Sequence, residues 1–338
     1  MKVLMCSFGS HGDVHPYLAM GRELLRRGHA VTLATSSVYR DTVVRHGLAF
    51  APVRPEARVD DLELMKRVMD PRRGPETIVK RILMPAVRDT YRDLEALATN
   101  ADLLVSHVLT YAVPILAERT GKPWASTVLS PMVFLSAYDP PVLAPLPQMA
   151  KLRSLGPGIN GWVFRQLKRF SRSWSQPAAA LRQEVGLPPG PDPLWEGQHS
   201  PHLVLAMFSP RFGPPQPDWP GNVQITGFPF LDEPEADVDA ELERFLADHA
   251  APIVFTLGSS AVKVAGDFYT MAALAAQDLH RPAVLVAGSA AGALKGSLPP
   301  TMAAVEWANF PKLFARAAAV VHSGGVGTTA QALRAGVP

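Results

Sequence analysis

The segment 322–329, HSGGVGTT, holds the residue types that best fit a binding chemistry. It follows an apolar run typical of a buried strand and precedes a run typical of a helix. A glycine turn between two such elements gathers backbone N–H groups and the positive end of the helix dipole at one point, which favours an anion such as phosphate. His322, Thr328 and Thr329 add side-chain donors. We predict a phosphate site, and the alternative is a tight turn that only connects the two elements.

Two familiar phosphate motifs are absent from this segment. No lysine follows the glycines as a P-loop requires, and the glycine spacing does not match the dinucleotide pattern GxGxxG. The segment therefore predicts an anion site of another class.

A second group of candidate residues, His11, Asp13 and His15, lies near the N-terminus. The i, i+4 spacing of the two histidines would suit metal ligands on a helix. Gly12 and Pro16 instead indicate a turn, and Pro16 fits the first position of the helix that follows. We therefore predict no metal site.

The elements that must position these residues alternate between strand and helix. Strands are expected at 3–8, 30–34, 102–108, 124–129 and 202–208, and again at 253–257, 283–287, 305 and 319–321. Helices are expected at 16–27, 111–118, 150–185, 239–248, 266–279 and 311–317, and after the glycine turn. The proline-rich stretches 139–147 and 210–220 are expected to be loops. This alternation predicts a doubly wound α/β fold.

The pattern restarts after an acidic stretch that contains proline. The chain has 338 residues, which also suggests two domains. We expect an N-terminal Rossmann-like domain over 1–228, a linker over 229–240 and a C-terminal Rossmann-like domain over 241–338.

The composition excludes several classes of protein. The 33 Lys and Arg residues nearly balance the 30 Asp and Glu residues, so the net charge of +3 gives no basic stripe for nucleic acid. Cys6 is the single cysteine, which excludes an intrachain disulfide and suits a reducing cytoplasm. No apolar stretch approaches the length of a membrane span. We expect a soluble, cytoplasmic protein.

Longer stretches around the candidate residues resemble a known family. The C-terminal stretch reads HSGGVGTTAQALRAGVP, and the N-terminal stretch reads GSHGDVHPYLAMGRELLRRGHAVTLAT, with GFPFLD and PIVFTLGSS between them. Together they resemble the GT-B glycosyltransferases, and among these the bacterial enzymes of the UDP-glycosyltransferase superfamily that glycosylate antibiotics, macrolides or sterols. The resemblance extends over essentially the whole chain and is weaker across 55–200.

This resemblance implies two doubly wound domains that face a cleft, with the nucleotide sugar bound mainly by the C-terminal one. It implies that His322 and the glycine turn hold the diphosphate, that Trp307 stacks on the base and that the backbone of Ala308 meets the base edge. The donor-binding residues that it indicates are Ser259, Trp307, Ala308, His322, Gly324, Gly325, Gly327 and Thr328. The alternative for Trp307 is a half-buried residue that closes a strand end.

The resemblance also places a catalytic base at Asp13, which would take the proton of the acceptor hydroxyl. The alternative is that Asp13 only caps the following helix, and the two roles are compatible. The acceptor-binding residues that it indicates are His11, His107, Met132, Phe134 and Tyr138. The alternatives are ordinary loop packing and, for His107, a histidine satisfied at a strand end.

The implied reaction is inverting, metal-independent transfer of a hexosyl group from a UDP- or dTDP-sugar to a hydroxyl of a lipophilic acceptor, such as a polyketide, macrolide, flavonoid or sterol-like ring. No cofactor is expected besides this sugar nucleotide. We expect no nucleic-acid partner and at most peripheral membrane contact, and the oligomeric state is left open. The alternatives are a non-catalytic GT-B auxiliary protein and a nucleotide-sugar epimerase.

Two features depart from the family pattern. Plant relatives have an acidic residue for the ribose where this chain has Ala330. The family also continues beyond Gly336-Val337-Pro338 to an Asp-Gln pair that binds the donor sugar. We therefore expect an incomplete C-terminal domain, a longer natural protein and low activity of this chain.

Overall fold

The computed structural model describes residues 1–56, 61–143, 146–232 and 240–338. The chain divides into two compact units, one formed by Met1–Asp60 and Asp70–Leu231 and the other by Asp61–Met69 and Asp232–Pro338. The prediction of one domain over 1–228 thus differs at Asp61–Met69, which groups with the second unit through helix α3 (Leu62–Val68). Most of the predicted linker, 229–240, lies outside the described residues.

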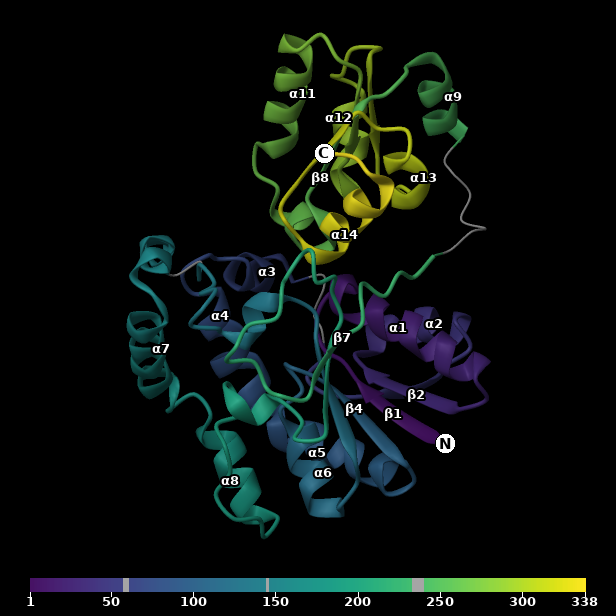
Figure 1. The fold of residues 1–338 in the computed structure, drawn as a ribbon. Helices are drawn as coiled ribbons and strands as arrows, with labels where there is room; N and C mark the ends of the chain where they lie inside the picture. The colour runs from purple at the N-terminus through teal and green to yellow at the C-terminus, as the bar shows by residue number, and fades with distance from the viewer. Residues whose placement is uncertain (57–60, 144–145, 233–239) are drawn as a thin grey trace. The chain divides into compact units, whose positions relative to one another are not determined.

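In the described part of the first unit, one seven-stranded sheet has the order β3-β2-β1-β4-β5-β6-β7, and its neighbouring strands are parallel (Figure 1). The strands are β1 (Lys2–Cys6), β2 (Ala30–Thr35), β3 (Ala49–Pro52), β4 (Leu103–His107), β5 (Trp124–Val128), β6 (Leu203–Ala206) and β7 (Val223–Ile225). The order reverses between β1 and β4, and the carboxyl ends of the two strands at such a switch point form the crevice where doubly wound folds bind ligands.

Helices cover both faces of this sheet. The helices of the first unit are α1 (His11–Arg26), α2 (Arg40–Arg45), α4 (Gly74–Glu76), α5 (Met84–Thr99), α6 (Ala112–Thr120), α7 (Pro157–Ser171) and α8 (Gln176–Glu184). A π-helical segment, Thr77–Leu83, leads into α5, and 3₁₀ segments lie at Ser37–Tyr39, Pro131–Phe134, Pro147–Leu155 and Glu196–Gln198. The expected helical region over 150–185 is therefore two helices preceded by a 3₁₀ segment.

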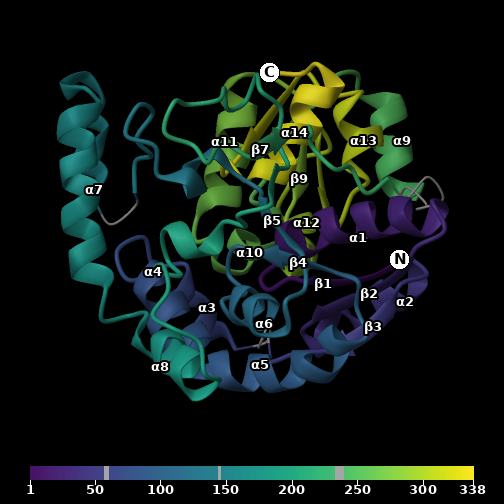
Figure 2. The same ribbon diagram turned by 60° about the horizontal axis from the view of Figure 1, so that its bottom comes forward.

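The alternation of side chains along β1 explains this layering. Val3 and Met5 lie in a buried cluster with α1 and α2, whereas Leu4 and Cys6 lie in another cluster with α5 and α6. Figure 2 shows α1 and α5 on opposite sides of the strands. A strand buried on both faces reads as a continuous apolar run, which is why its position could be predicted.

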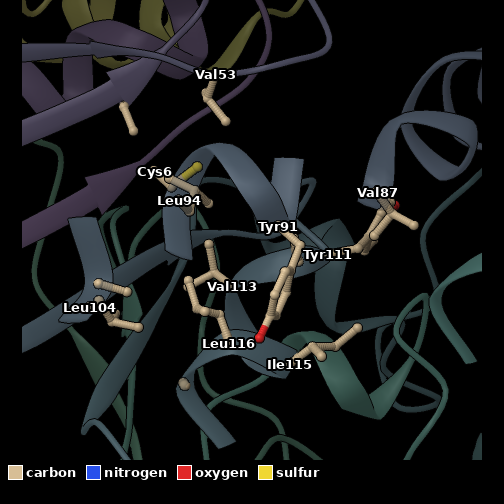
Figure 3. Packing of buried hydrophobic residues seen from close by; sticks show 14 of the residues in the cluster. Cys6, Val53, Val87, Tyr91, Leu94, Leu104, Tyr111, Val113, Ile115 and Leu116 are labelled. Carbon is tan, nitrogen blue, oxygen red and sulfur yellow. The ribbon is translucent and has the colours of Figure 1, made fainter. Parts of the chain in front are cut away.

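Cys6 lies inside this core (Figure 3). Its side chain is 1% exposed, and burial raises the pKa of the thiol to about 12. It is therefore a protonated, inert core residue.

The start of α1 differs from the prediction. Pro16 was expected at the first helical position, but the helix begins at His11 and Pro16 lies inside it. Ser10 is the N-cap, and its pairing with Asp13 forms a capping box that fixes the earlier start. The C-terminal end is as predicted, because Gly28 has a φ of 80° and directly follows the C-cap residue Arg27.

The described part of the second unit contains a four-stranded parallel sheet with the order β10-β9-β8-β11. The strands are β8 (Ile253–Thr256), β9 (Ala283–Val286), β10 (Met302–Val305) and β11 (Ala319–His322). The helices besides α3 are α9 (Ala240–Asp248), α10 (Gly258–Ala261), α11 (Phe268–Asp278), α12 (Ala291–Lys295), α13 (Phe310–Phe314) and α14 (Val326–Ala335). The 3₁₀ segments are Val262–Val264 and Gly288–Ala290. Here the order reverses between β8 and β11, the two strands that precede the glycine turns.

Candidate functional sites in the two units

Asp13 lies in the first turn of α1, directly beyond the carboxyl end of β1. Its Oδ2 accepts hydrogen bonds from the Ser10 backbone N–H at 2.7 Å and from Ser10 Oγ at 3.1 Å. Asp13 therefore caps the helix, which is one of the two roles that the sequence predicts for it. Its side chain is still 30% exposed, and Oδ1 takes no part in the cap.

His107 approaches the other oxygen of this carboxylate. It is the last residue of β4, is buried, and places Nε2 3.6 Å from Asp13 Oδ1. The Leu109 backbone N–H donates to His107 Nδ1 at 3.3 Å, so Nδ1 carries the lone pair and the proton of the neutral ring is on Nε2. Burial lowers the pKa of His107, and the charge of Asp13 opposes this only in part. A neutral imidazole thus directs its N–H toward the carboxylate.

Gly9 leaves the room that the carboxylate occupies. Its φ is 138°, and a Cβ at this position would lie 2.1 Å from Asp13 Oδ2. Tyr39 donates its hydroxyl to the Gly9 carbonyl at 3.0 Å, and Ser7 Oγ donates to the Asp13 carbonyl at 2.9 Å. The position of Asp13 is therefore fixed by both its side chain and the surrounding backbone.

His11 lies on the same turn of α1. Its ring centroid is 5.2 Å from that of His15 and 5.3 Å from that of Tyr39. The rejection of helical spacing for the two histidines was wrong, because α1 begins at His11 and contains both of them. Among the described residues, no group of three or more His, Cys, Asp or Glu side chains is placed to hold a metal ion.

The other predicted acceptor residues differ in their surroundings. Met132 and Tyr138 are 49% and 52% exposed. Phe134 instead stacks between His199 and Trp219, with centroid distances of 5.3 and 4.2 Å, and it lines a cavity of about 510 Å³. The remaining walls of this cavity come from the neighbours of Phe134 within 133–137, from α7 and from residues 195–201 and 218–222.

The glycine turn of the second unit lies between β11 and α14. The Gly324 backbone N–H donates to His322 Nδ1 at 3.1 Å, so the proton of the neutral ring is on Nε2. Burial lowers the pKa of His322, which favours this neutral form. Gly325 is the N-cap of α14, and the first N–H groups of a helix have no acceptor within it. The exposed glycines of the turn leave these groups open to a ligand.

A second glycine turn follows the neighbouring strand β8. Gly258 has a φ of 73°, and a Cβ there would lie 3.9 Å from Thr328 Oγ1. Ser259 is exposed in the single helical turn α10, and Ser323 Oγ donates to the Leu257 carbonyl at 2.9 Å. The two turns thus lie side by side at the switch point of the sheet.

Trp307 and Ala308 follow β10 at the other end of the same sheet. Trp307 is 57% exposed, which leaves its ring available for stacking, whereas Ala308 is buried. Asn309 then caps α13 by accepting from the Lys312 backbone N–H at 3.3 Å. Three strand spacings, about 14 Å, separate β10 from β11, so a ligand that reaches both Trp307 and His322 has to be extended.

Sequence reasoning did not single out Gly9 or Ser10 as parts of the site. The spacing Ser10-x-x-Asp13 is the sequence signal of a capping box and would have given both the cap and the helix start. Nothing local in the sequence indicates that Gly9 faces the carboxylate, because that contact depends on its backbone conformation.

Comparisons with known proteins agree with this architecture. A family model described as the glycosyltransferase family 28 N-terminal domain matches residues 3–130. The O-mycaminosyltylonolide 6-deoxyallosyltransferase of Streptomyces fradiae is 33% identical over 350 residues, which cover 100% of this chain and 79% of that protein. A sterol 3-beta-glucosyltransferase of Leptosphaeria maculans is 26% identical, and this chain covers 24% of it.

Solved structures show the same fold. The glycotransferase of kitacinnamycin has a TM-score of 0.73 at 21% identity, over 100% of this chain and 79% of that one. The calicheamicin glycosyltransferase CalG4 has a TM-score of 0.71 at 20% identity, over 100% and 78%. The spinosyn rhamnosyltransferase SpnG, solved with thymidine diphosphate, has a TM-score of 0.64 at 18% identity, over 100% and 79%.

No helix among the described residues is long and apolar enough to cross a membrane.

The two parallel sheets, the matched family model and the relative at 33% identity lead to one assignment. The chain belongs to the GT-B glycosyltransferases, in the group that includes enzymes of antibiotic and macrolide glycosylation.

Proposed function

We propose that the protein transfers a hexosyl group from a UDP- or dTDP-sugar to a hydroxyl of a lipophilic acceptor, with inversion and without a metal ion. The observation that carries this proposal is the Asp13 carboxylate at the switch point between β1 and β4, with one oxygen used by the helix cap and the other outside it. The names of the relatives support the reaction class, since they describe glycosyl transfer to a macrolide precursor and to sterols.

In this proposal Asp13 Oδ1 is the general base. The acceptor oxygen attacks the anomeric carbon, its proton passes to Oδ1, and the bond from that carbon to the diphosphate oxygen breaks. The base has to stand opposite the leaving group, so the configuration inverts. The Nε2–H of His107 is directed at Oδ1 from 3.6 Å and helps to hold the orientation of the carboxylate. Because an ionised aspartate is a weak base for an alcohol, proton transfer accompanies bond formation instead of preceding it.

The leaving diphosphate is stabilised by the second unit. The open N–H groups at the start of α14 and the Nε2–H of His322 are fixed before the reaction, so they stabilise developing negative charge without reorganising. Gly324, Gly325, Gly327 and Thr328 supply the turn, and Ser259 contributes from the turn after β8. Trp307 stacks on the base, with the backbone of Ala308 at its edge. Structures of neighbours that contain thymidine diphosphate support a nucleoside diphosphate as the ligand.

The acceptor is proposed to be lipophilic. Met132 and Tyr138 are exposed apolar side chains on the segment after β5, and His11 lies on the same helical turn as Asp13. Phe134 enters this proposal only as a support for that segment, because it is stacked between His199 and Trp219.

The test offers UDP- and dTDP-hexoses with a panel of polyketide, macrolide, flavonoid and sterol acceptors, in the presence of a chelator. Protein in excess over acceptor allows a single turnover to be detected by mass spectrometry. The expected result is an acceptor heavier by one hexosyl group, nucleoside diphosphate released only when acceptor is present, and an inverted anomeric configuration by NMR. Isomerised sugar nucleotide without acceptor would favour an epimerase, and nucleotide binding with no product would favour an auxiliary protein.

A further inference from the structure

Helix α7 presents an apolar stripe on the side that faces away from the first unit. Its inner side contains the buried residues Asn160 and Phe164, and Asn160 Nδ2 donates to the Ala137 carbonyl at 2.9 Å. Figures 1 and 2 both show α7 at the margin of the first unit, away from its sheet.

The exposed apolar residues of α7 lie on one side of the helix. Ile159, Trp162 and Phe170 are 46%, 56% and 71% exposed. Their spacing of i, i+3 and i+11 places them within about 80° of one another around the helix axis. We name these three residues the α7 stripe. An apolar stripe on a surface helix normally faces a core, so one that faces solvent indicates an interaction surface.

The sequence segment that contains α7 carries charge of a single sign. Between Asp139 and Glu184 the sequence has seven Lys or Arg residues and no Asp or Glu. Three of them form ion pairs with acids elsewhere, namely Arg153, Lys168 and Arg182. In the described part of the chain, Lys151, Arg165, Arg169 and Arg172 have no such partner.

The exposed apolar stripe and the unpaired cationic residues together indicate which partner fits this surface. A second copy of the chain, docked by the same surface, would bring cationic residues against cationic residues, which disfavours self-association. An anionic lipid surface complements both features, because aromatic and aliphatic side chains insert at the headgroup boundary while arginines contact the phosphates.

We propose that α7 docks the protein on anionic membranes, with the stripe inserted at the interface and Arg165, Arg169 and Arg172 at headgroup level. This contact is independent of the proposed reaction, since it uses neither Asp13 nor the glycine turns. It would hold the protein at the surface where lipophilic acceptors concentrate.

Co-sedimentation with lipid vesicles tests the proposal. Vesicles with roughly one-third phosphatidylserine should bind the protein at least ~tenfold more tightly than pure phosphatidylcholine vesicles, and added salt should weaken this binding. The double variant Trp162→Ala/Phe170→Ala should lose most of the binding, and Arg165→Gln/Arg169→Gln should lose the dependence on phosphatidylserine. The matched control, Met271→Ala/Leu274→Ala, removes two exposed apolar residues from α11 and should bind like wild type.

Circular dichroism and size-exclusion chromatography accompany each variant. Equal binding to both kinds of vesicle, or unchanged binding by both α7 variants, would overturn the proposal. A wild-type dimer that Trp162→Ala/Phe170→Ala converts to monomer would also overturn it, in favour of self-association. Because sedimentation measures no turnover, a failed glycosyl-transfer assay leaves this result unaffected.

Discussion

Each of the two units contains a histidine held by the same backbone hydrogen bond, but the groups around the two histidines differ. In each, a backbone N–H two residues further along the chain donates to Nδ1, from Leu109 to His107 and from Gly324 to His322, so that Nε2 carries the proton. In the first unit the Nε2–H of His107 faces the Asp13 carboxylate, which also accepts from the Ser10 N–H and lies against Gly9. In the second unit the Nε2–H of His322 has no acceptor among the described residues, and it lies beside backbone N–H groups at the start of α14 that have no acceptor within the helix.

Under the proposed function, this contrast separates two tasks. The first unit holds one negative charge at a fixed place, so changes there should alter the rate while leaving nucleotide affinity intact. The second unit presents donors without an internal anion, so changes there should alter affinity for the nucleotide. Variants of Asp13, Gly9, His322 and His107 test this division of tasks.

The largest effect is expected from Asp13→Asn. Asparagine keeps an oxygen that can accept from the Ser10 N–H, so the helix cap is retained, but it cannot take a proton. We expect kcat to fall about 10²–10⁴-fold, with nucleotide affinity unchanged by calorimetry. Activity within twofold of wild type would remove Asp13 as the base.

Gly9→Ala should be the next most damaging change. The new methyl group would collide with Asp13 Oδ2 and also force a non-glycine residue into a positive φ, which costs about 1–3 kcal/mol of stability. Gly28→Ala is the matched control, because it has a φ of 80° and no atom within 4 Å of the added Cβ. Both variants should melt earlier, but Gly9→Ala alone should lose kcat. Equal kcat in the two variants would show that Gly9 does not position the carboxylate.

His322→Ala should weaken nucleoside diphosphate binding about tenfold, the loss expected for one hydrogen bond to a charged ligand. His107→Ala serves as the comparison, since it should reduce kcat and leave this affinity unchanged. Calorimetric titration with UDP and dTDP measures the affinity. An unchanged dissociation constant for His322→Ala would contradict the proposed phosphate site.

The smallest effect is a pH dependence of stability. Burial holds the pKa of His107 below its ordinary value of 6.5, so below that pH the unfolded chain binds the proton more readily than the folded chain. The contribution of neutral His107 to the free energy of unfolding is therefore complete above pH 6.5. It is lost as the pH falls, by at most about 1.4 kcal/mol per pH unit for this one group.

Urea unfolding of wild type and His107→Gln at pH 7.5 and 5.5 isolates this contribution. Burial also lowers the pKa of His199, to about 4, but that histidine is common to both proteins and cancels in the difference. A smaller loss of stability for His107→Gln on acidification is expected. Equal losses would show that folding does not lower the pKa of His107.

The sequence was most informative where strands are buried on both faces. β1 and β11 could be predicted from continuous apolar runs, and the glycine turn after β11 from its residue types. The start of α1 could not be predicted from Pro16, because a proline in the second helical turn removes only one hydrogen bond and a capping box had already fixed the start. The stack of Phe134 on Trp219 depends on residues far apart in the chain, which no local pattern reveals.

The burial of Cys6 has a practical consequence for measurements on this enzyme. Its thiol is protonated at neutral pH and is enclosed by the core, so maleimide reagents should not reach it. A pair of new cysteines at exposed positions, such as Val44 in one unit and Leu333 in the other, can therefore carry fluorescent dyes with the native cysteine left in place. Energy transfer between the dyes would then report the separation of the two units as sugar nucleotide is added.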